Sequence, residues 1–149
     1  MSHYEVGHWI NGAATRGSGE RQQDIHNPAT GQVQGCLLLG SVADLDAAVA
    51  SATQAAKAWS QTPPLARARV LFKFLTLLQE RKEQLAEAIV REHGKTLPDA
   101  LGEVARGIEV VEFATAMPQL LKGEYTEQIA RGMDAWSLRQ PLGVVAGIT

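Results

Sequence analysis

The sequence predicts an α/β fold, and three observations support this prediction. The first 40 residues contain short apolar segments separated by turn residues, a pattern typical of strands. Residues 41–118 repeat apolar positions at helical spacing. Residues 142–148 form an uninterrupted apolar run, which is typical of a strand covered on both faces of a parallel sheet. With 149 residues, of which 45% are hydrophobic, the chain is long enough for one ordinary domain.

Two turns organise the predicted strands. The pair Asn11-Gly12 directly follows the apolar residues 8–10, which is a strong signal for a β-hairpin. Residues 27–31, Asn-Pro-Ala-Thr-Gly, form a second corner between two further short strands. Between these hairpins, the polar, glycine-containing residues 16–20 are expected to form an exposed loop.

The helical part begins after Gly40. Ser41 and Asp44 have the spacing of a capping box, in which a hydroxyl and a carboxylate satisfy free N–H groups at the start of a helix. This first helix is expected to end at Thr62, before two prolines. A second helical region covers residues 65–89, with a break near residues 81–83.

A third helix is expected from Thr96, after a cap at Gly94, to about Pro118. Its helical spacing separates two faces. One is an apolar seam; the other places charged and bulky apolar residues together. The seam consists of Leu101, Val104, Ile108 and Val111, and the mixed face of Glu103, Arg106, Val110 and Phe113.

The last third of the chain is expected to be extended. Residues 129–138 are too interrupted by glycine for a good helix, so we predict one long, partly exposed strand that Pro141 ends. The buried strand expected at residues 142–148 would need a neighbouring strand and a crossover connection. We therefore expect a sequence that is unfinished at its C-terminus, and aggregation of the isolated chain.

Composition excludes several classes of function. A net charge of -2 and a pI near 6.1 give no basic surface for nucleic acid or anionic membranes. The longest apolar runs are far below the roughly 20 residues that a membrane span needs. The single cysteine, Cys36, allows no intramolecular disulfide and is expected to be a structural thiol. Residues 1–6 show no targeting signal, so we expect a cytoplasmic protein.

Neither a metal site nor a phosphate-binding loop is predicted. The four histidines have no partners at zinc-ligand spacing. The stretch Gly94-Lys95-Thr96 resembles the end of a phosphate-binding loop, but Ile89 stands where that loop requires glycine.

Arg106 is the candidate functional residue that physical chemistry singles out. An arginine on a largely apolar face needs a carboxylate or phosphate partner or must reach solvent, and its planar guanidinium suits bidentate binding of a carboxylate. The alternative is an intrahelical pair with Glu103 or Glu109, three residues to either side. Periodicity alone favours this structural alternative.

Several motifs resemble the aldehyde dehydrogenase superfamily along essentially the whole chain. They are the Asn-Pro-Ala-Thr-Gly turn at residues 27–31, the alanine-rich helix ending in Trp59, and the Glu-His-Gly-Lys stretch at residues 92–95. Residues 100–114, with Gly-Glu-Val-Ala-Arg-Gly followed by Val-Glu-Phe-Ala, and residues 121–124 more narrowly resemble the methylmalonate-semialdehyde dehydrogenase group.

This resemblance implies a division of the chain into three parts. Residues 1–122 would be the N-terminal strands and helices of an NAD-binding domain, and residues 123–141 part of an oligomerisation arm of a homotetramer. Residues 142–149 would be the first strand of a Rossmann-like sheet.

The resemblance also implies an activity and site residues. It implies a semialdehyde substrate, NAD as cofactor and coenzyme A as acyl acceptor, with oxidation and loss of carbon dioxide through a cysteine thioester. Arg106 would bind the substrate carboxylate, Phe113 would wall the substrate pocket, and Ile148 and Thr149 would line the nicotinamide site. The catalytic asparagine and cysteine would follow Thr149, so these 149 residues alone would be inactive.

Two alternatives remain open at this point. One is a hydrolytic semialdehyde dehydrogenase, in which water accepts the acyl group. The other is a non-enzymatic oligomerisation module made of the helices and the β arm. A native product of 16.0 kDa in the cell would favour this module.

Overall fold

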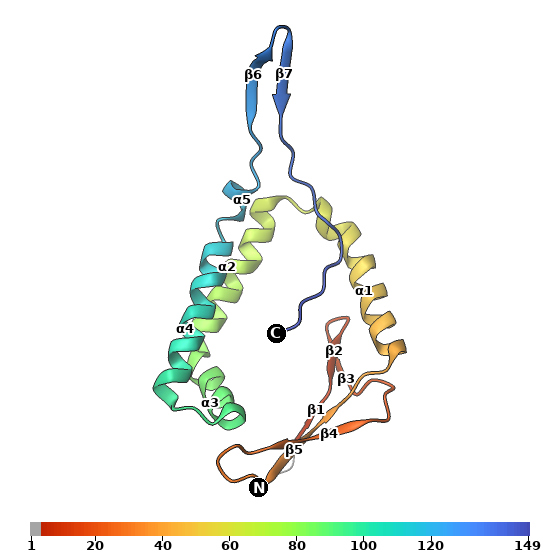
Figure 1. Ribbon diagram of the computed structural model, residues 1–149, viewed down its shortest axis with the longest axis vertical. Helices are drawn as coiled ribbons and strands as arrows, with labels where there is room; N and C mark the ends of the chain where they lie inside the picture. Colours follow the sequence, from red (N-terminus) through yellow and green to blue (C-terminus); the bar gives the residue numbers. More distant parts are fainter. Residues whose placement is uncertain (1–3) are drawn as a thin grey trace.

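The computed structural model describes residues 4–149 (Figure 1). Residues 1–3 lie outside the described residues. They include His3 and half of the segment 1–6 in which no targeting signal was expected. Strands come first along the chain, then helices, then a projecting hairpin, so the predicted α/β order is confirmed (Figure 1).

Three of the N-terminal strands form a mixed sheet in the order β1-β5-β4. Strand β5 lies in the middle, parallel to β1 and antiparallel to β4. Their bounds are Tyr4–Val6 for β1, Gln22–His26 for β4 and Val33–Leu38 for β5. The turn predicted at residues 27–31 joins β4 to β5, where Asn27 Oδ1 accepts a hydrogen bond from the Ala29 amide at 2.9 Å.

The first predicted hairpin is also confirmed. Strands β2 (His8–Ile10) and β3 (Ala13–Thr15) pair antiparallel on either side of Asn11 and Gly12. Both turn residues have positive φ, 54° and 74°, the backbone conformation that explains why Asn-Gly is the preferred pair here.

Five helices follow, and their boundaries agree with the capping signals. They are α1 (Val42–Gln61), α2 (Pro64–Glu80), α3 (Lys82–His93), α4 (Leu97–Ala114) and the short α5 (Met117–Leu120).

The capping box of α1 forms as predicted. Ser41 Oγ accepts from the Asp44 amide at 3.2 Å, and the Asp44 carboxylate accepts from the Ser41 amide at 2.8 Å. The backbone amide of Ser18 donates to the same carboxylate at 2.8 Å. These hydrogen bonds, with that from Ser41 the largest contribution, hold the pKa of Asp44 far below its usual range.

The end of the third predicted helix differs from expectation. Helix α4 ends at Ala114, and Pro118 lies in the first turn of α5 instead of continuing α4. Thr115 Oγ1 donates to the Glu112 carbonyl at 2.6 Å. The ring nitrogen of Pro118 has no hydrogen to donate to a preceding carbonyl, so α4 cannot continue through it.

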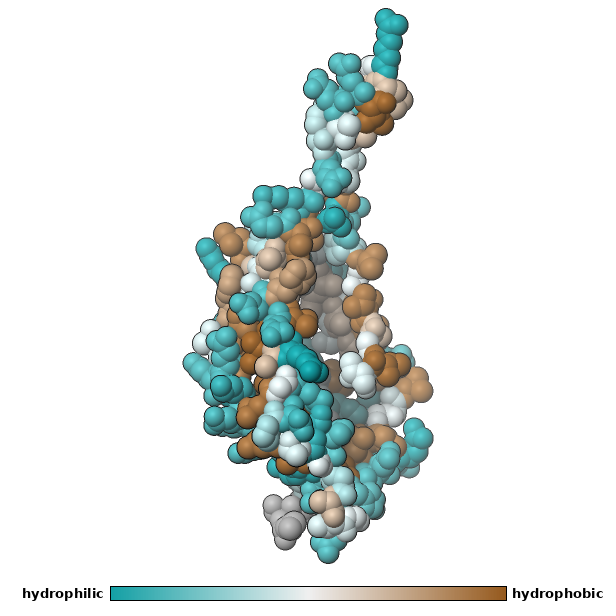
Figure 2. All heavy atoms as spheres, turned by 60° about the vertical axis from the view of Figure 1, so that its left-hand side comes forward, coloured by the Kyte–Doolittle hydropathy of each residue, from teal (hydrophilic) through white to brown (hydrophobic). Residues whose placement is uncertain are grey.

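Helix α4 packs against both α2 and α3, with small side chains at the contacts. Ala68, Ala86 and Ala100, one on each of these helices, are completely buried. Among residues 4–149 these three alanines and Leu38 are the only buried hydrophobic residues, and no large side chain is fully enclosed. Figure 2 shows apolar side chains exposed over much of the helical part. The contacts within this chain therefore cover only a small part of its apolar surface.

The mixed sheet is joined to α3 by polar contacts. Gln34 Nε2 donates to the backbone carbonyl of Arg91 at 3.1 Å, and the Arg91 guanidinium lies 5.3 Å from the centroid of the Tyr4 ring. The Tyr4 hydroxyl donates to Glu92 at 3.2 Å. Desolvation, followed by the Glu92 carboxylate, raises the pKa of Tyr4 above its ordinary value.

The long strand expected at residues 129–138 was a wrong prediction. The chain reverses at Arg131 and Gly132, so strand β6 (Tyr125–Ala130) pairs antiparallel with β7 (Met133–Trp136). Gly132 has a φ of +74°, which a glycine adopts without strain. In the sequence this glycine counts against a helix, but in the structure it marks a hairpin turn. The hairpin projects from the helices at the top of Figure 1.

The strand expected at residues 142–148 does not form within this chain. Residues 138–149 make no backbone hydrogen bond to another described residue. Leu142 is 95% exposed and Ile148 fully so. A strand needs a hydrogen-bonded neighbour, and no segment within residues 4–149 supplies one. Within residues 4–149, no helix is both long and apolar enough to cross a membrane.

Candidate functional site

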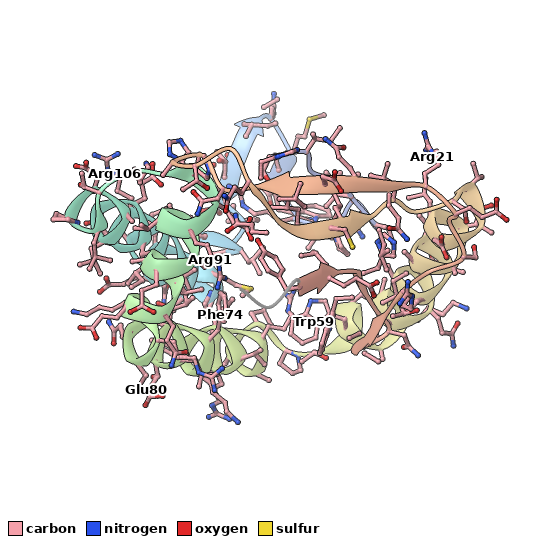
Figure 3. The ribbon with its side chains drawn as sticks, turned by 90° about the horizontal axis from the view of Figure 1, so that it is seen from below. Arg21, Trp59, Phe74, Glu80, Arg91 and Arg106 are labelled. Carbon is pink, nitrogen blue, oxygen red and sulfur yellow. The ribbon has the colours of Figure 1, made fainter. Side chains whose placement is uncertain are left out.

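Helix α4 separates its side chains into the two faces that its spacing predicts. Leu101, Val104, Ile108 and Val111 are half-buried against the neighbouring helices. Arg106 and Phe113 are exposed on another side of α4, the latter by 67%. Figure 3 shows Arg106 at the outer side of α4, away from Phe74 and Arg91.

The start of α4 fixes the side chains around Arg106. Gly94, at a φ of +83°, ends α3, and Thr96 caps α4 by accepting from the Asp99 amide at 3.4 Å. Thr96 Oγ1 also donates to the Asp99 carboxylate at 2.7 Å. These two caps leave Lys95 alone between two helix ends, beside the first turns of α4.

Lys95 and Glu103 form an ion pair next to Arg106. The Lys95 side chain is 17% exposed and that of Glu103 47%, so the pair is partly shielded from solvent. The Lys95 ammonium is the largest cause that lowers the pKa of Glu103, with weaker contributions from His93 and then Arg106. Glu103 is therefore an ionised carboxylate whose ion-pair partner is Lys95.

The intrahelical pairs considered for Arg106 do not form. Among residues 4–149 its guanidinium makes no ion pair with Glu103 or Glu109 and no hydrogen bond to another side chain. The donors of an exposed guanidinium in this state are available to solvent or to a ligand.

A shallow polar hollow of about 370 Å³ lies along this side of α4. Its lining residues include both partners of the ion pair and Arg106, together with three residues from the first turns of α4. The lining residues are Lys95, Pro98, Asp99, Gly102, Glu103 and Arg106. The hollow is large enough for a small carboxylate and offers it one cation without a carboxylate partner.

The other three predicted site residues lie apart from this hollow. Phe113 follows Arg106 by seven residues, which is roughly 10 Å along a helix, and it does not line the hollow. Ile148 and Thr149 end an exposed segment that belongs to no strand or helix. This chain alone therefore does not enclose a site that contains all four residues.

A larger hollow of about 530 Å³ lies between the β2–β3 hairpin and the start of α1. Its lining is mainly apolar, with Trp9, Val42 and Leu45 among its walls, and it contains none of the predicted site residues. Its carboxylate, Asp44, is already held by Ser18 and Ser41.

Comparison with known proteins decides the family. The profile of the aldehyde dehydrogenase family matches residues 15–149, which is most of the chain. The chain belongs to this family. It is 51% identical over its whole length to malonate-semialdehyde dehydrogenase 1 of Bacillus licheniformis, and 46% identical over 142 residues to the malonate-semialdehyde dehydrogenase of Pseudomonas aeruginosa.

Solved structures agree with this assignment. A protein assigned as a methylmalonate-semialdehyde dehydrogenase from Sinorhizobium meliloti 1021, in complex with NAD, superposes with a TM-score of 0.90 and 49% identity over 95% of this aldehyde dehydrogenase chain. The methylmalonate-semialdehyde dehydrogenase of Oceanimonas doudoroffii gives 0.88 and 42% over 93%. The predicted N-terminal portion of the aldehyde dehydrogenase fold is thus confirmed. The chain spans about 30% of the length of the Bacillus relative and 29% of the Sinorhizobium structure.

Sequence reasoning missed one residue of this site. Lys95 drew attention only as part of a rejected phosphate-binding motif, yet the aldehyde dehydrogenase chain places it against Glu103. The available signal was its position directly before the helix cap Thr96, where a lysine can reach the first turns of the next helix. Among residues 4–149 no cluster of side chains suits a metal ion.

Proposed function

We propose that this chain is the N-terminal portion of an NAD-dependent, coenzyme A-acylating malonate- or methylmalonate-semialdehyde dehydrogenase. The reaction is oxidative decarboxylation of the semialdehyde to acetyl-CoA or propionyl-CoA. The observation that carries the proposal is the unpaired Arg106 guanidinium beside a carboxylate-sized hollow, in a chain that is 51% identical to a malonate-semialdehyde dehydrogenase.

Arg106 binds the substrate carboxylate in this proposal. Malonate semialdehyde carries its carboxylate one carbon from the aldehyde, so a bidentate guanidinium contact orients the reacting carbonyl as well as binding the molecule. Phe113, exposed on the same side of α4, supplies an apolar wall once further parts of the enzyme cover it. The catalytic asparagine and cysteine lie outside these 149 residues, and the chain alone is inactive.

The C-terminal segment contributes to the NAD site. NAD, when bound, supplies the acceptor for the hydride that leaves the substrate. Residues 142–149 contain no charged side chain, and their backbone groups make no hydrogen bonds to the rest of the chain. A strand end with available N–H and C=O groups fits the carboxamide of a nicotinamide ring, which both donates and accepts hydrogen bonds. Ile148 and Thr149 would form this wall.

The three-part organisation is part of the same proposal. Residues 1–122 belong to the NAD-binding domain, residues 123–141 to an oligomerisation arm of a homotetramer, and residues 142–149 to the first strand of the NAD-binding sheet. The projection of the β6–β7 hairpin from the helices and the exposure of Trp136 by 76% support the arm. We place the enzyme in the cytoplasm. Cys36 is the single cysteine of this sequence and is a free thiol, which suits a reducing compartment.

Substitution of Arg106 by leucine in the full-length enzyme tests this proposal. We expect the KM for malonate semialdehyde to rise between about tenfold and a hundredfold, because a charge-assisted pair is lost. The KM for propanal should not change, because propanal has the same three-carbon length but carries a methyl group in place of the carboxylate. Arg69→Leu is the matched control, since Arg69 is exposed on α2 and lines no part of the hollow.

An equal effect of Arg106→Leu on both aldehydes would contradict the carboxylate role. The same assay distinguishes the hydrolytic alternative: a coenzyme A-acylating enzyme forms one acyl-CoA for each NADH, whereas a hydrolytic enzyme forms NADH and a free acid without coenzyme A.

A further inference from the structure

Three carboxylates surround Arg106 on α4, and each could compete with the substrate for its guanidinium. Glu103 lies three residues before it, Glu109 three residues after it, and Asp99 two turns before it. Residues three apart on a helix are neighbours, and an acidic residue on the N-terminal side of a cation pairs better than the reverse order. Glu103 is therefore the strongest competitor for Arg106.

The chain gives two of these carboxylates other partners. Asp99 accepts a hydrogen bond from Thr96 Oγ1 at 2.7 Å as part of the helix cap. Glu103 pairs with Lys95, whose side chain is 83% covered and so is held in place more firmly than an exposed lysine. Arg106 already attracts Glu103, as its lowering effect on the pKa of that carboxyl shows. His93 on α3 also lowers this pKa, and by more than Arg106 does, but Arg106 lies one turn from Glu103 on the same helix, at the spacing of an intrahelical pair.

We propose that Lys95 is a positioning residue that holds Glu103 away from Arg106 and so keeps the guanidinium available for the substrate carboxylate. This inference rests on the carboxylate role proposed for Arg106. Lys95 does not touch the substrate; it determines which carboxylate Arg106 binds. The pair thereby sets specificity for acidic over neutral aldehydes.

The local backbone is built to place Lys95 in this position. Gly94 closes α3 at a φ of +83°, and Thr96 opens α4, so Lys95 alone spans the gap between the two helix ends. Gly102 borders the same hollow and has open space at the position of a Cβ, which leaves room beside the ion pair. A substrate carboxylate entering there meets Arg106 on one side and a neutralised Lys95–Glu103 pair on the other.

The experiment is a double-mutant cycle in the full-length enzyme, with Lys95→Met, Glu103→Gln and the double variant. Lys95→Met should raise the KM for malonate semialdehyde about tenfold, because Glu103 then pairs with Arg106. The KM for propanal and the kcat for both aldehydes should stay within about twofold of the parent values. Glu103→Gln in the Lys95→Met background should restore the KM, since glutamine carries no charge to compete.

Two further variants make the result specific to the charge of Lys95. Lys95→Arg should keep the KM near the parent value, because arginine also pairs with Glu103. Lys73→Met removes an exposed lysine from α2 and should have no effect on either substrate.

The outcomes separate this inference from the proposed function. If Arg106→Leu affects only the acidic aldehyde but the double variant stays as impaired as Lys95→Met, Lys95 has a purely structural role and the inference is wrong. A Lys95→Met defect shared by both aldehydes overturns it as well. If Arg106→Leu itself leaves the KM for malonate semialdehyde unchanged, the carboxylate role fails, and the inference fails with it.

Discussion

The N-terminal and C-terminal parts of this chain differ in where their contacts come from. In residues 4–122 the mixed sheet is tied to α3, and α4 packs against both α2 and α3, where Ala68, Ala86 and Ala100 are buried. In residues 123–149 the β6–β7 hairpin is paired only with itself, and its residue Trp136 is 76% exposed. Residues 138–149 make no backbone hydrogen bond to any other part of residues 4–149.

This difference shows what a local pattern can and cannot establish. Both parts contain apolar residues, and burial of each apolar side chain is worth roughly 1.5–3 kcal/mol wherever a partner exists. Leu38 has such partners and is 4% exposed, whereas Leu142 is 95% exposed. Most of the apolar run at residues 142–148 is exposed, so it gains little stabilisation from residues 4–149 and needs a surface from elsewhere.

The largest expected effect comes from a matched pair of leucine truncations, Leu38→Ala and Leu142→Ala, in the full-length enzyme. Leu38→Ala should destabilise it by about 3 kcal/mol, because a buried leucine is replaced by a cavity. If only the contacts within this chain counted, Leu142→Ala would leave the free energy of unfolding unchanged, because Leu142 is 95% exposed. Our proposal that residues 142–149 lie in a sheet predicts a cost similar to that of Leu38→Ala. Thermal unfolding of both variants gives the comparison, and a neutral Leu142→Ala would contradict the proposal.

A smaller effect separates two glycines with similar backbones. Gly94 and Gly132 have φ of +83° and +74°, so alanine at either position costs roughly 1 kcal/mol in strain. A Cβ at Gly94 would lie 2.8 Å from Pro28 Cγ, whereas one at Gly132 meets nothing within 4 Å. We expect Gly94→Ala to cost about 1 kcal/mol more than Gly132→Ala in thermal unfolding. Equal costs would mean that the hairpin tip is as tightly packed in the enzyme as the α3–α4 corner.

Much of the fold was predictable from sequence because its signals are local. The Asn11-Gly12 turn, the Ser41 capping box and the Gly94 cap each depend on a few neighbouring residues, and all three formed as predicted. The β6–β7 hairpin was missed because Gly132 counts equally against a helix and for a turn. The strand at residues 142–148 was not found because strand formation depends on a neighbour, which no local pattern can supply.

The candidate site was predictable only in part for the same reason. Helical periodicity placed Arg106 and Phe113 on one exposed side of α4, as the structure has them. Periodicity also favoured an intrahelical pair for Arg106, which was wrong; for Glu103 the reason is that Lys95, from outside the helix, pairs with it. Lys95 competes with Arg106 for Glu103 from eight residues before that glutamate. This competition can be recognised only once the corner between α3 and α4 is known.

The central claim is that residues 142–148 form a strand covered by parts of the enzyme beyond this chain. Amide hydrogen exchange of the full-length enzyme measures it most directly, with strand β5 (Val33–Leu38) as the internal reference. We predict that amides of residues 142–148 exchange as slowly as those of β5, at least about a hundredfold slower than an unprotected segment. Exchange of residues 142–148 at the rate of a free, unpaired chain would contradict the claim.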